Sequence, residues 1–293
     1  MSRLFSCALA ALVLLLAPTA SAQDNADLRR VVLTNGDVLV GTVADESADP
    51  VVLTTSAGIE QRIPRDQIEE IGPLLDGRFT RYDPARTRLF VSPTARSLGA
   101  GNRRFSAYYV FPSVAFGVNE RLDVSVGSTI PLIGVGLDGE ALVVLNGNAK
   151  VTLVEGEGFA AAVGGNALVP VSSSEGVPGV GGAVYGLATF GGDAGAVTLG
   201  AFGVYATDFE DGVFGDGVAI LVGLERQVSD QFKVISENYL LVPFEDQGVG
   251  IGTLTGVRFF SDRLAADAAV AFGGADGDFT TIPIPYLGLS YTF

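Results

Sequence analysis

The chain has 293 residues, with 33 acidic side chains against 18 basic ones and therefore a formal charge of −15. This acidic balance argues against nucleic acid or any other anionic partner. Histidine is absent, which excludes His-dependent nucleophilic triads and His-ligated zinc, and we expect no enzyme and no catalytic residues.

Residues 1–22 have the features of a secretory signal peptide. Arg3 supplies a positive start, residues 7–17 are apolar, and Ala20-Ser21-Ala22 offers small residues for cleavage. The apolar run is too short to span a bilayer. Cleavage would remove Cys7, the only cysteine, so the exported chain is expected to hold no disulfide and no Cys-ligated metal.

Short apolar runs separated by turn residues predict a small β-domain at residues 28–75. Apolar runs flank Asn35-Gly36-Asp37, and Asn-Gly between such runs predicts a hairpin. Further short strands are expected at 51–55 and 59–63, followed by a helical turn or a last strand at 64–71. With Gly41 after the Asn-Gly turn, the segment weakly resembles SH3-like or Sm-like barrels. Sm-like folds often bind RNA, but an exported acidic chain favours a periplasmic docking domain and a protein partner.

Residues 76–87 are interpreted as an Arg-rich linker, and residues 88–93 as the first strand of a second domain. The arginines of this region lie either against phosphate headgroups and acidic loops or on a solvated face. They are Arg78, Arg81, Arg86, Arg88, Arg96, Arg103 and Arg104.

Residues 88–293 predict an antiparallel barrel of about twelve strands, with ten as the alternative. The mean hydropathy is +0.40, yet no segment after the signal peptide is apolar for the length of a membrane helix. Strand-length segments instead alternate with short and then long connections, as in a membrane barrel with short periplasmic turns. After 88–93 we expect strands at 105–118, 121–131, 142–154, 159–169, 179–190, 196–206, 218–228, 232–242, 249–260, 263–272 and 282–293.

Side-chain alternation and aromatic placement support that reading. In 142–154, Val143, Leu145 and Val151 share one face, and Asn146 and Lys150 share the other. Aromatic residues gather at the ends of the expected strands, as in interfacial girdles. They are Phe116, Phe159, Phe190, Phe232, Phe259 and Phe293 at the turn ends, with Tyr205 and Phe272 at the loop ends.

The final residues, 286–293, alternate to a terminal aromatic. Gly288, Tyr291 and Phe293 occupy the positions of the carboxyl-terminal signal that this stretch resembles, that of bacterial outer-membrane β-barrel proteins. The resemblance implies an all-β transmembrane barrel in the outer membrane, in contact with its lipid. It also implies recognition of the last strand by the barrel-insertion machinery. We expect this strand to pair with 263–272 and with 88–93.

The faces opposite the apolar ones supply candidates for lining the lumen. They mix acids, bases and amides, a balance that does not favour strong ion selectivity, and side chains or a folded-in loop can fill such a lumen. The leading hypothesis is passive passage of small polar solutes, and the alternative is a non-conducting barrel that anchors the periplasmic domain. The candidates are Asp123, Asn146, Asn148, Lys150, Glu225, Lys233, Glu237, Arg258 and Asp267.

The expected external loops beyond the first are acidic. Eleven acids without a base would repel one another unless salt screens them or divalent cations bridge them. Neither acidic cluster matches an EF-hand loop, and a solvated acidic surface is the simpler interpretation. No resident cofactor is expected, and the weak Ca²⁺ candidates are Asp208, Glu210, Asp211, Asp276 and Asp278.

Overall fold

A computed structural model describes most of the chain after residue 27. The described ranges are 28–75, 79–109, 111–129, 132–133, 141–172, 179–208, 212–213, 217–244, 248–275 and 278–293. The predicted signal peptide, residues 1–22, lies outside them. The chain divides into two units, 1–82 and 83–293. No helix in the described part is long and apolar enough to cross a membrane.

The first unit is a five-stranded antiparallel sheet in the order β4-β3-β2-β1-β5. The last strand follows a 3-10 turn, η1, so the segment at 64–71 holds both elements that the sequence offered as alternatives. The strands are β1 (Leu28–Leu33), β2 (Val38–Val43), β3 (Val51–Thr54), β4 (Glu60–Ile63) and β5 (Ile68–Pro73), with η1 at Arg65–Gln67.

This sheet depends on a tight turn, a glycine at a close contact between strands, and a small buried core. The Asn35-Gly36 turn joins β1 to β2, with the Asn35 Oδ1 accepting the backbone N–H of Asp37 at 3.0 Å. At Gly41 a Cβ would lie 2.4 Å from the carbonyl oxygen of Thr54 on β3, so only glycine allows this approach. Val31, Leu53 and Ile63 form the buried core.

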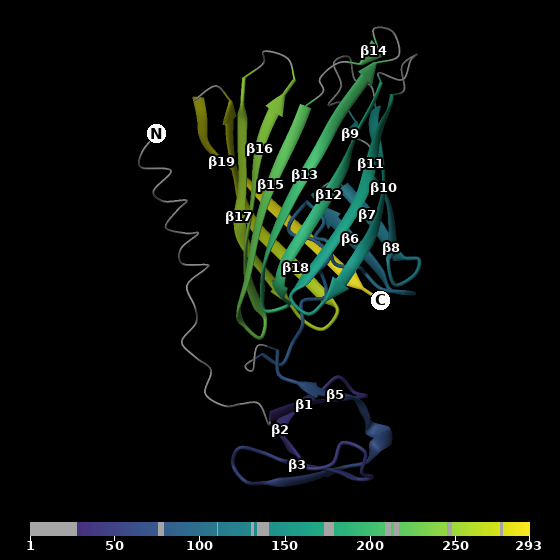
Figure 1. The fold of residues 1–293 in the computed structure, drawn as a ribbon, viewed down its shortest axis with the longest axis vertical. Coiled ribbons are helices and arrows are strands. Elements are labelled where there is room, and N and C mark those ends of the chain that lie inside the picture. Colours follow the sequence, from purple (N-terminus) through teal and green to yellow (C-terminus); the bar gives the residue numbers. More distant parts are fainter. Residues whose placement is uncertain are drawn as a thin grey trace. The chain divides into compact units, whose positions relative to one another are not determined.

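The second unit is a closed antiparallel barrel of twelve wall strands within the described residues (Figure 1). Closure comes from the pairing of β10 with β11 and of β19 with β6. Short strands β9 (Leu132–Ile133) and β14 (Gly212–Val213) extend it. The wall strands are β6 (Arg103–Tyr108), β7 (Phe111–Gly117), β8 (Leu122–Ser128), β10 (Ala141–Gly156), β11 (Phe159–Ser172), β12 (Val180–Gly192), β13 (Gly195–Asp208), β15 (Gly217–Ser229), β16 (Phe232–Pro243), β17 (Gly250–Phe260), β18 (Leu264–Ala275) and β19 (Asp278–Thr292).

The expected strand count is confirmed, but two of the predicted strands are wrong. Residues 88–93 are not in the wall, and β19 pairs with β6 instead. The predicted strand 105–118 is two strands, β6 and β7, which close a hairpin at the Tyr108–Phe111 pair. Its turn contains Tyr109 at φ 48°, a conformation that aromatic residues rarely adopt and that no turn motif in the sequence announces.

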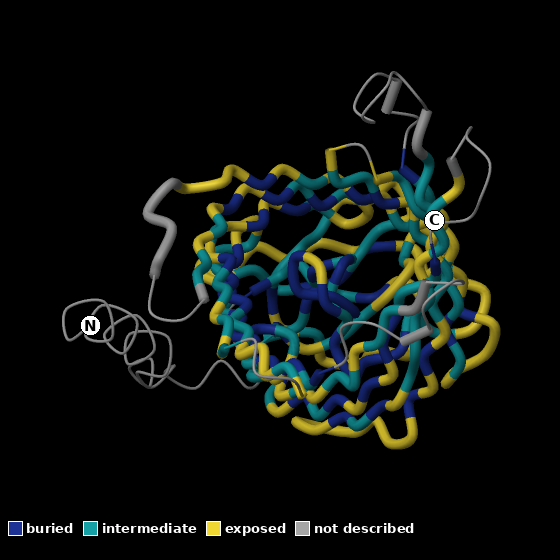
Figure 2. Tube along the Cα trace, turned by 90° about the horizontal axis from the view of Figure 1, so that it is seen from above, coloured by how far each residue is buried: buried dark blue, intermediate teal, exposed yellow. Residues whose placement is uncertain are grey.

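Buried and exposed residues alternate along the wall strands, as the end-on view in Figure 2 shows. On β16, Lys233, Ile235 and Glu237 are fully buried and face the interior, while Phe232 and Leu240 are exposed on the outside. The exterior carries aromatic pairs at the turn ends, with ring centroids 5.2 Å apart for Phe159–Phe190 and for Phe232–Phe259. A closed barrel with this apolar, aromatic-edged exterior is an outer-membrane β-barrel.

Candidate functional site inside the barrel

Residues 83–98 fold into the barrel interior, and we call this segment the plug. Leu89, Phe90 and Ala95 are fully buried, and Arg88 and Arg96 are nearly so. A tight hairpin brings Arg88 opposite Pro93, with the Leu89 N–H donating to the Ser92 carbonyl at 2.9 Å. The segment that the sequence assigned to a wall strand therefore fills the space that the wall encloses.

Arg258 on β17 is the centre of the largest charged cluster. Its guanidinium contacts Asp267 on β18 at 2.6 Å and Asp83 of the plug at 3.0 Å, and it donates to the carbonyl oxygen of Leu89. Lys233 and Arg88 complete the cluster, at 3.0 Å from Asp83 and 2.8 Å from Asp267 respectively. Three wall strands, β16, β17 and β18, thus hold the first half of the plug by fully buried ion pairs.

The same cluster sets the protonation state of the Asp83 carboxyl group. Burial alone would raise the pKa of this group, but the charges of Arg258 and Lys233 outweigh burial and hold the pKa below its ordinary value. The carboxylate therefore stays ionised and remains a partner for both cations.

Two further ion pairs hold the second half of the plug. Arg96 contacts Glu225 on β15 at 2.7 Å, and Lys150 on β10 contacts Asp123 on β8 at 3.2 Å. Lys150 also donates to the carbonyl oxygen of Thr94 at 3.1 Å. Cations and anions alternate through the interior, which is how buried charges avoid an uncompensated desolvation cost.

Glu237 on β16 binds the plug hairpin by its backbone. Its carboxylate oxygens accept the N–H groups of Phe90, Val91 and Ser92 at 2.9, 3.0 and 2.8 Å. Three convergent N–H groups form an anion-binding concavity, and here the occupant is a fully buried side chain of the wall. Tyr239 continues the network, since its hydroxyl contacts both Glu237 and Ser92.

Beside the plug hairpin the interior changes from charged to aromatic. Tyr286 on β19 donates its hydroxyl to the carbonyl oxygen of Phe90 at 3.0 Å, and the two rings are 5.6 Å apart. Tyr108 lies 5.9 Å from Tyr286 on the neighbouring strand. The cluster continues around the wall with the following apolar side chains: Tyr185, Leu187, Phe202, Leu221, Tyr239 and Leu254.

Farther along the barrel from the short turns, large apolar residues occupy inward positions and are exposed. Alternation along the strands places Leu168, Val204, Leu241 and Ile284 on the inner face, with exposed fractions of 39%, 37%, 47% and 62%. A lumen shaped only for water and polar solutes has no reason to present such side chains. The interior therefore has a charged zone, defined by the ion pairs at the plug, and an apolar zone, defined by these residues and the aromatic cluster.

The structure locates the predicted lumen residues in two groups. Asn146 and Asn148 are inward on β10, and the Asn148 amide pairs with the Tyr185 hydroxyl at 3.0 Å. Whether any of the candidates contacts a passing solute stays a prediction. The others contact the plug directly or through one ion pair: Asp123, Lys150, Glu225, Lys233, Glu237, Arg258 and Asp267.

The Ca²⁺ candidates fall at or beyond the edge of the described chain. Glu210, Asp211 and Asp276 lie outside it, and Asp208 and Asp278 end β13 and begin β19 without a described side chain. In the part that the structure describes, no group of three or more His, Cys, Asp or Glu side chains is placed to hold a metal ion. The calcium hypothesis stays a prediction.

The predicted insertion-signal residues lie on the terminal strand. Tyr291 and Phe293 face outward, with ring centroids 4.9 Å apart, and Gly288 faces inward opposite Tyr108. Their recognition by the insertion machinery stays a prediction.

Sequence reasoning missed the plug and the aromatic cluster. A usable signal existed for the plug, because residues 83–98 carry three arginines while the inward positions of distant strands carry four acids against only three bases. No comparable signal marked the aromatic cluster, since its rings come from separate strands and meet only through closure of the barrel.

No family model and no curated protein sequence matches the chain. Among solved structures it is similar to a KdgM porin, with 10% identity, a TM-score of 0.43, and coverage of 66% of this chain and 98% of the porin. It is also similar to the CymD monoaromatic hydrocarbon channel (11% identity, TM-score 0.35, 65% of this chain and 73% of the channel). A third similar structure is the Pseudomonas putida toluene transporter TodX, with 10% identity, a TM-score of 0.34, and coverage of 75% of this chain and 98% of the transporter.

Proposed function

We propose that this chain is an exported outer-membrane barrel that takes up small apolar or aromatic molecules through a plugged lumen. The observation that carries the proposal is the apolar zone, in which inward Leu241 and Ile284 are about half exposed or more. Each lies two residues along its strand from a tyrosine of the aromatic cluster, Tyr239 or Tyr286, and Phe202 is in register with Leu241 through Ala219 of β15. Binding sites for small molecules are concave and mostly apolar, with a few polar groups that fix orientation. The hydroxyls of the tyrosines supply such groups.

The polar side chains of the interior support a different role, that of fixing the plug. Charges bound to Asp83, Arg88 and Arg96 are unavailable to hydrate a passing solute while the plug is in place. We infer that the plug must move before a solute passes through the barrel, and that the resting barrel is closed to ions. Uptake of small polar solutes remains an alternative, favoured by inward Asn146 and Asn148 on β10.

The plug also favours a second candidate function, a non-conducting barrel that anchors the first unit. Residue 83 follows the first unit directly in the sequence, so the buried ion pairs of the plug tether that unit to the barrel. Under this proposal no solute passes, and a periplasmic protein bound by residues 28–75 is the functional partner.

Ligand binding separates these functions. The chain has no Trp and eight Tyr, so energy transfer from tyrosine to naphthalene reports an aromatic ligand in the lumen. We expect saturable transfer in detergent-solubilised barrel, and about 3- to 10-fold weaker binding after Phe202→Ala, as the loss of one aromatic contact implies. The matched control is Tyr205→Ala, which removes an outward ring three residues along the same strand. Equal affinities in the two variants, or no saturable transfer, would contradict the apolar lumen and favour the anchor.

A further inference from the structure

The outer face of the barrel bears a polar cluster in an otherwise apolar belt. Ser236 and Asn238 lie on β16, and Thr253 and Thr255 lie opposite them on β17. Their neighbours in sequence Glu237 and Leu254 are buried in the interior, so alternation turns these four side chains outward.

The cluster is linked by hydrogen bonds. The Ser236 and Thr255 hydroxyls lie 2.9 Å apart, and the Thr253 hydroxyl donates to the Asn238 Oδ1 at 2.8 Å. The Asn238 amide donates to Ser236 and to the carbonyl oxygen of Val222. These bonds use both amide hydrogens of Asn238 but leave acceptor capacity on its oxygen and on the hydroxyls.

The cluster lies at the depth of the hydrocarbon core. Asn238 is six residues along β16 from Phe232, which belongs to the aromatic girdle at the turn end. A strand tilted by roughly 40° gains about 2.5 Å of height per residue, which puts Asn238 about 15 Å above the girdle, near the middle of an apolar band about 25 Å tall. Each polar atom of the cluster already has one partner within the wall, so its remaining acceptor positions gain a further bond only from a donor outside the wall, which hydrocarbon does not supply.

Corresponding outward positions on other described strands are apolar. On β11, β12 and β13 the outward residues at this depth are Val163, Val184, Leu199 and Ala201, with glycines between them. The polar cluster is therefore a local feature of one side of the barrel and does not reflect a general tolerance of its exterior.

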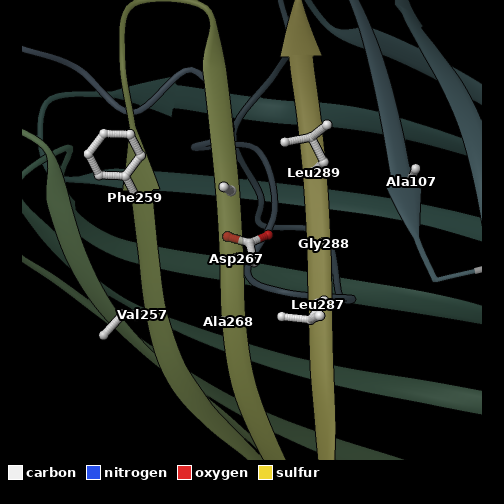
Figure 3. Close-up of a pocket in the computed structure, with 9 residues that line it drawn as sticks. Ala107, Val257, Phe259, Asp267, Ala268, Leu287, Gly288 and Leu289 are labelled. Atoms are coloured by element: carbon white, nitrogen blue, oxygen red, sulfur yellow. The ribbon is translucent and has the colours of Figure 1, made fainter.

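A hollow adjoins the cluster on the same side. It holds about 470 Å³, and its floor includes Ala266 and Ala268 of β18. Val257 and Phe259 of β17 border it on one side and Leu287 and Leu289 of β19 on the other, as Figure 3 shows. Small residues between larger ones make a groove that accepts protruding side chains, as small residues do at interfaces within membranes.

We propose that the outer face of β16–β19 is a self-association surface, occupied by a second copy of this chain in a twofold arrangement. The cluster keeps one free hydroxyl hydrogen, on Ser236 or Thr255, together with unfilled acceptor positions, so each copy can donate one bond to the other across a twofold axis. The groove and the bordering Phe259, Leu287 and Leu289 of one copy likewise match those of the other. Lipid tails fill a groove but offer no donor to the remaining acceptor positions of Asn238 and the threonines, and no acceptor to the free hydroxyl hydrogen.

Cross-linking in the membrane tests the surface. Thr255→Cys in a Cys7→Ser background is oxidised with copper phenanthroline in isolated outer membranes. We expect a disulfide-linked dimer at least 10-fold more abundant than with Val151→Cys, an outward control on β10 whose side chain is similarly accessible. Equal cross-linking at the two positions would overturn the proposal.

Mass measurement of the detergent-solubilised chain gives the second test. We expect twice the mass of one chain, and the mass of one chain for Asn238→Leu combined with Thr253→Val. Heat-modifiable migration on a gel confirms that this variant is still a folded barrel. A monomeric wild type, an assembly of other than two copies, or a double variant that stays dimeric contradicts the proposal. Lipid as the occupant corresponds to the first of these results. None of these results depends on which solute passes through the lumen.

Discussion

The charged and apolar zones lie inside the same barrel but differ in whether the plug covers their inward side chains. In the charged zone, inward side chains of β15 to β18 are fully buried because the plug contacts them, and each charge has a partner within 3.2 Å. In the apolar zone, inward Leu241 and Ile284 remain exposed because no described segment covers them. Polarity of an inward face therefore does not identify the path of a solute: here the polar face holds a segment of the chain, and the open face is apolar.

The largest effect on this contrast should come from Arg258→Met. The substitution leaves two buried carboxylates short of a cation and removes the donor to the Leu89 carbonyl, so we expect about 3–5 kcal/mol of destabilisation. Urea unfolding in micelles, followed by the heat-modifiable gel band, measures it. Arg121→Met at an exposed turn is the control and should change stability by less than about 0.5 kcal/mol.

Glu237→Gln should loosen the plug without unfolding the barrel. A neutral amide replaces a carboxylate that accepts three N–H groups, and the loss of charge-assisted bonds costs about 2–3 kcal/mol. Hydrogen exchange at Phe90, Val91 and Ser92 should accelerate about 30- to 150-fold. Glu157→Gln at an exposed turn should leave these amides protected, and equal exchange in both variants would show that Glu237 does not hold the hairpin.

Gly223→Val should displace the plug by volume instead of charge. A Cβ at this inward position of β15 would lie 2.2 Å from the Leu89 Cδ1, and Leu89 is fully buried. Overpacking of this kind costs about 1–3 kcal/mol, so we expect a lower urea midpoint together with brief conductance events in planar bilayers. Gly186→Val, at a position on β12 with open space around it, is the matched control. A silent Gly223→Val barrel of unchanged stability would argue that the plug does not close the lumen.

Leu241→Ser should have the smallest effect on stability and act on the apolar zone alone. The side chain is about half exposed, so we expect a change in unfolding free energy within about 0.5–1 kcal/mol. Naphthalene binding should weaken, while hydrogen exchange at Phe90 to Ser92 stays unchanged. A large loss of stability would show that Leu241 packs in a core, and the two zones would then differ less than the structure indicates.

Much of the barrel could be predicted because the alternation of residue types along a strand shows which side chains face inward and which face outward. Alternation gave the inner and outer sides of β10 correctly, with Asn146 and Lys150 inward and Leu145 and Val151 outward. The aromatic girdle and the short turns followed from the same local patterns. The predicted strand 105–118 failed because its apolar run continues through the Tyr109 turn, which lacks the Gly or Asn that usually marks such a turn.

The sequence by itself determined the architecture: an all-β chain, a small sheet followed by a closed antiparallel barrel, and an apolar exterior. These follow from local periodicity and turn chemistry, which neighbouring residues specify. Only the tertiary structure decided the use of the interior, because residues 88–93 look like a strand until closure of the barrel brings Glu237, Arg258 and Asp267 around them. The ion pairs of the plug join residues that are far apart in the chain and meet only in the folded barrel. The segment predicted as a wall strand is therefore the plug.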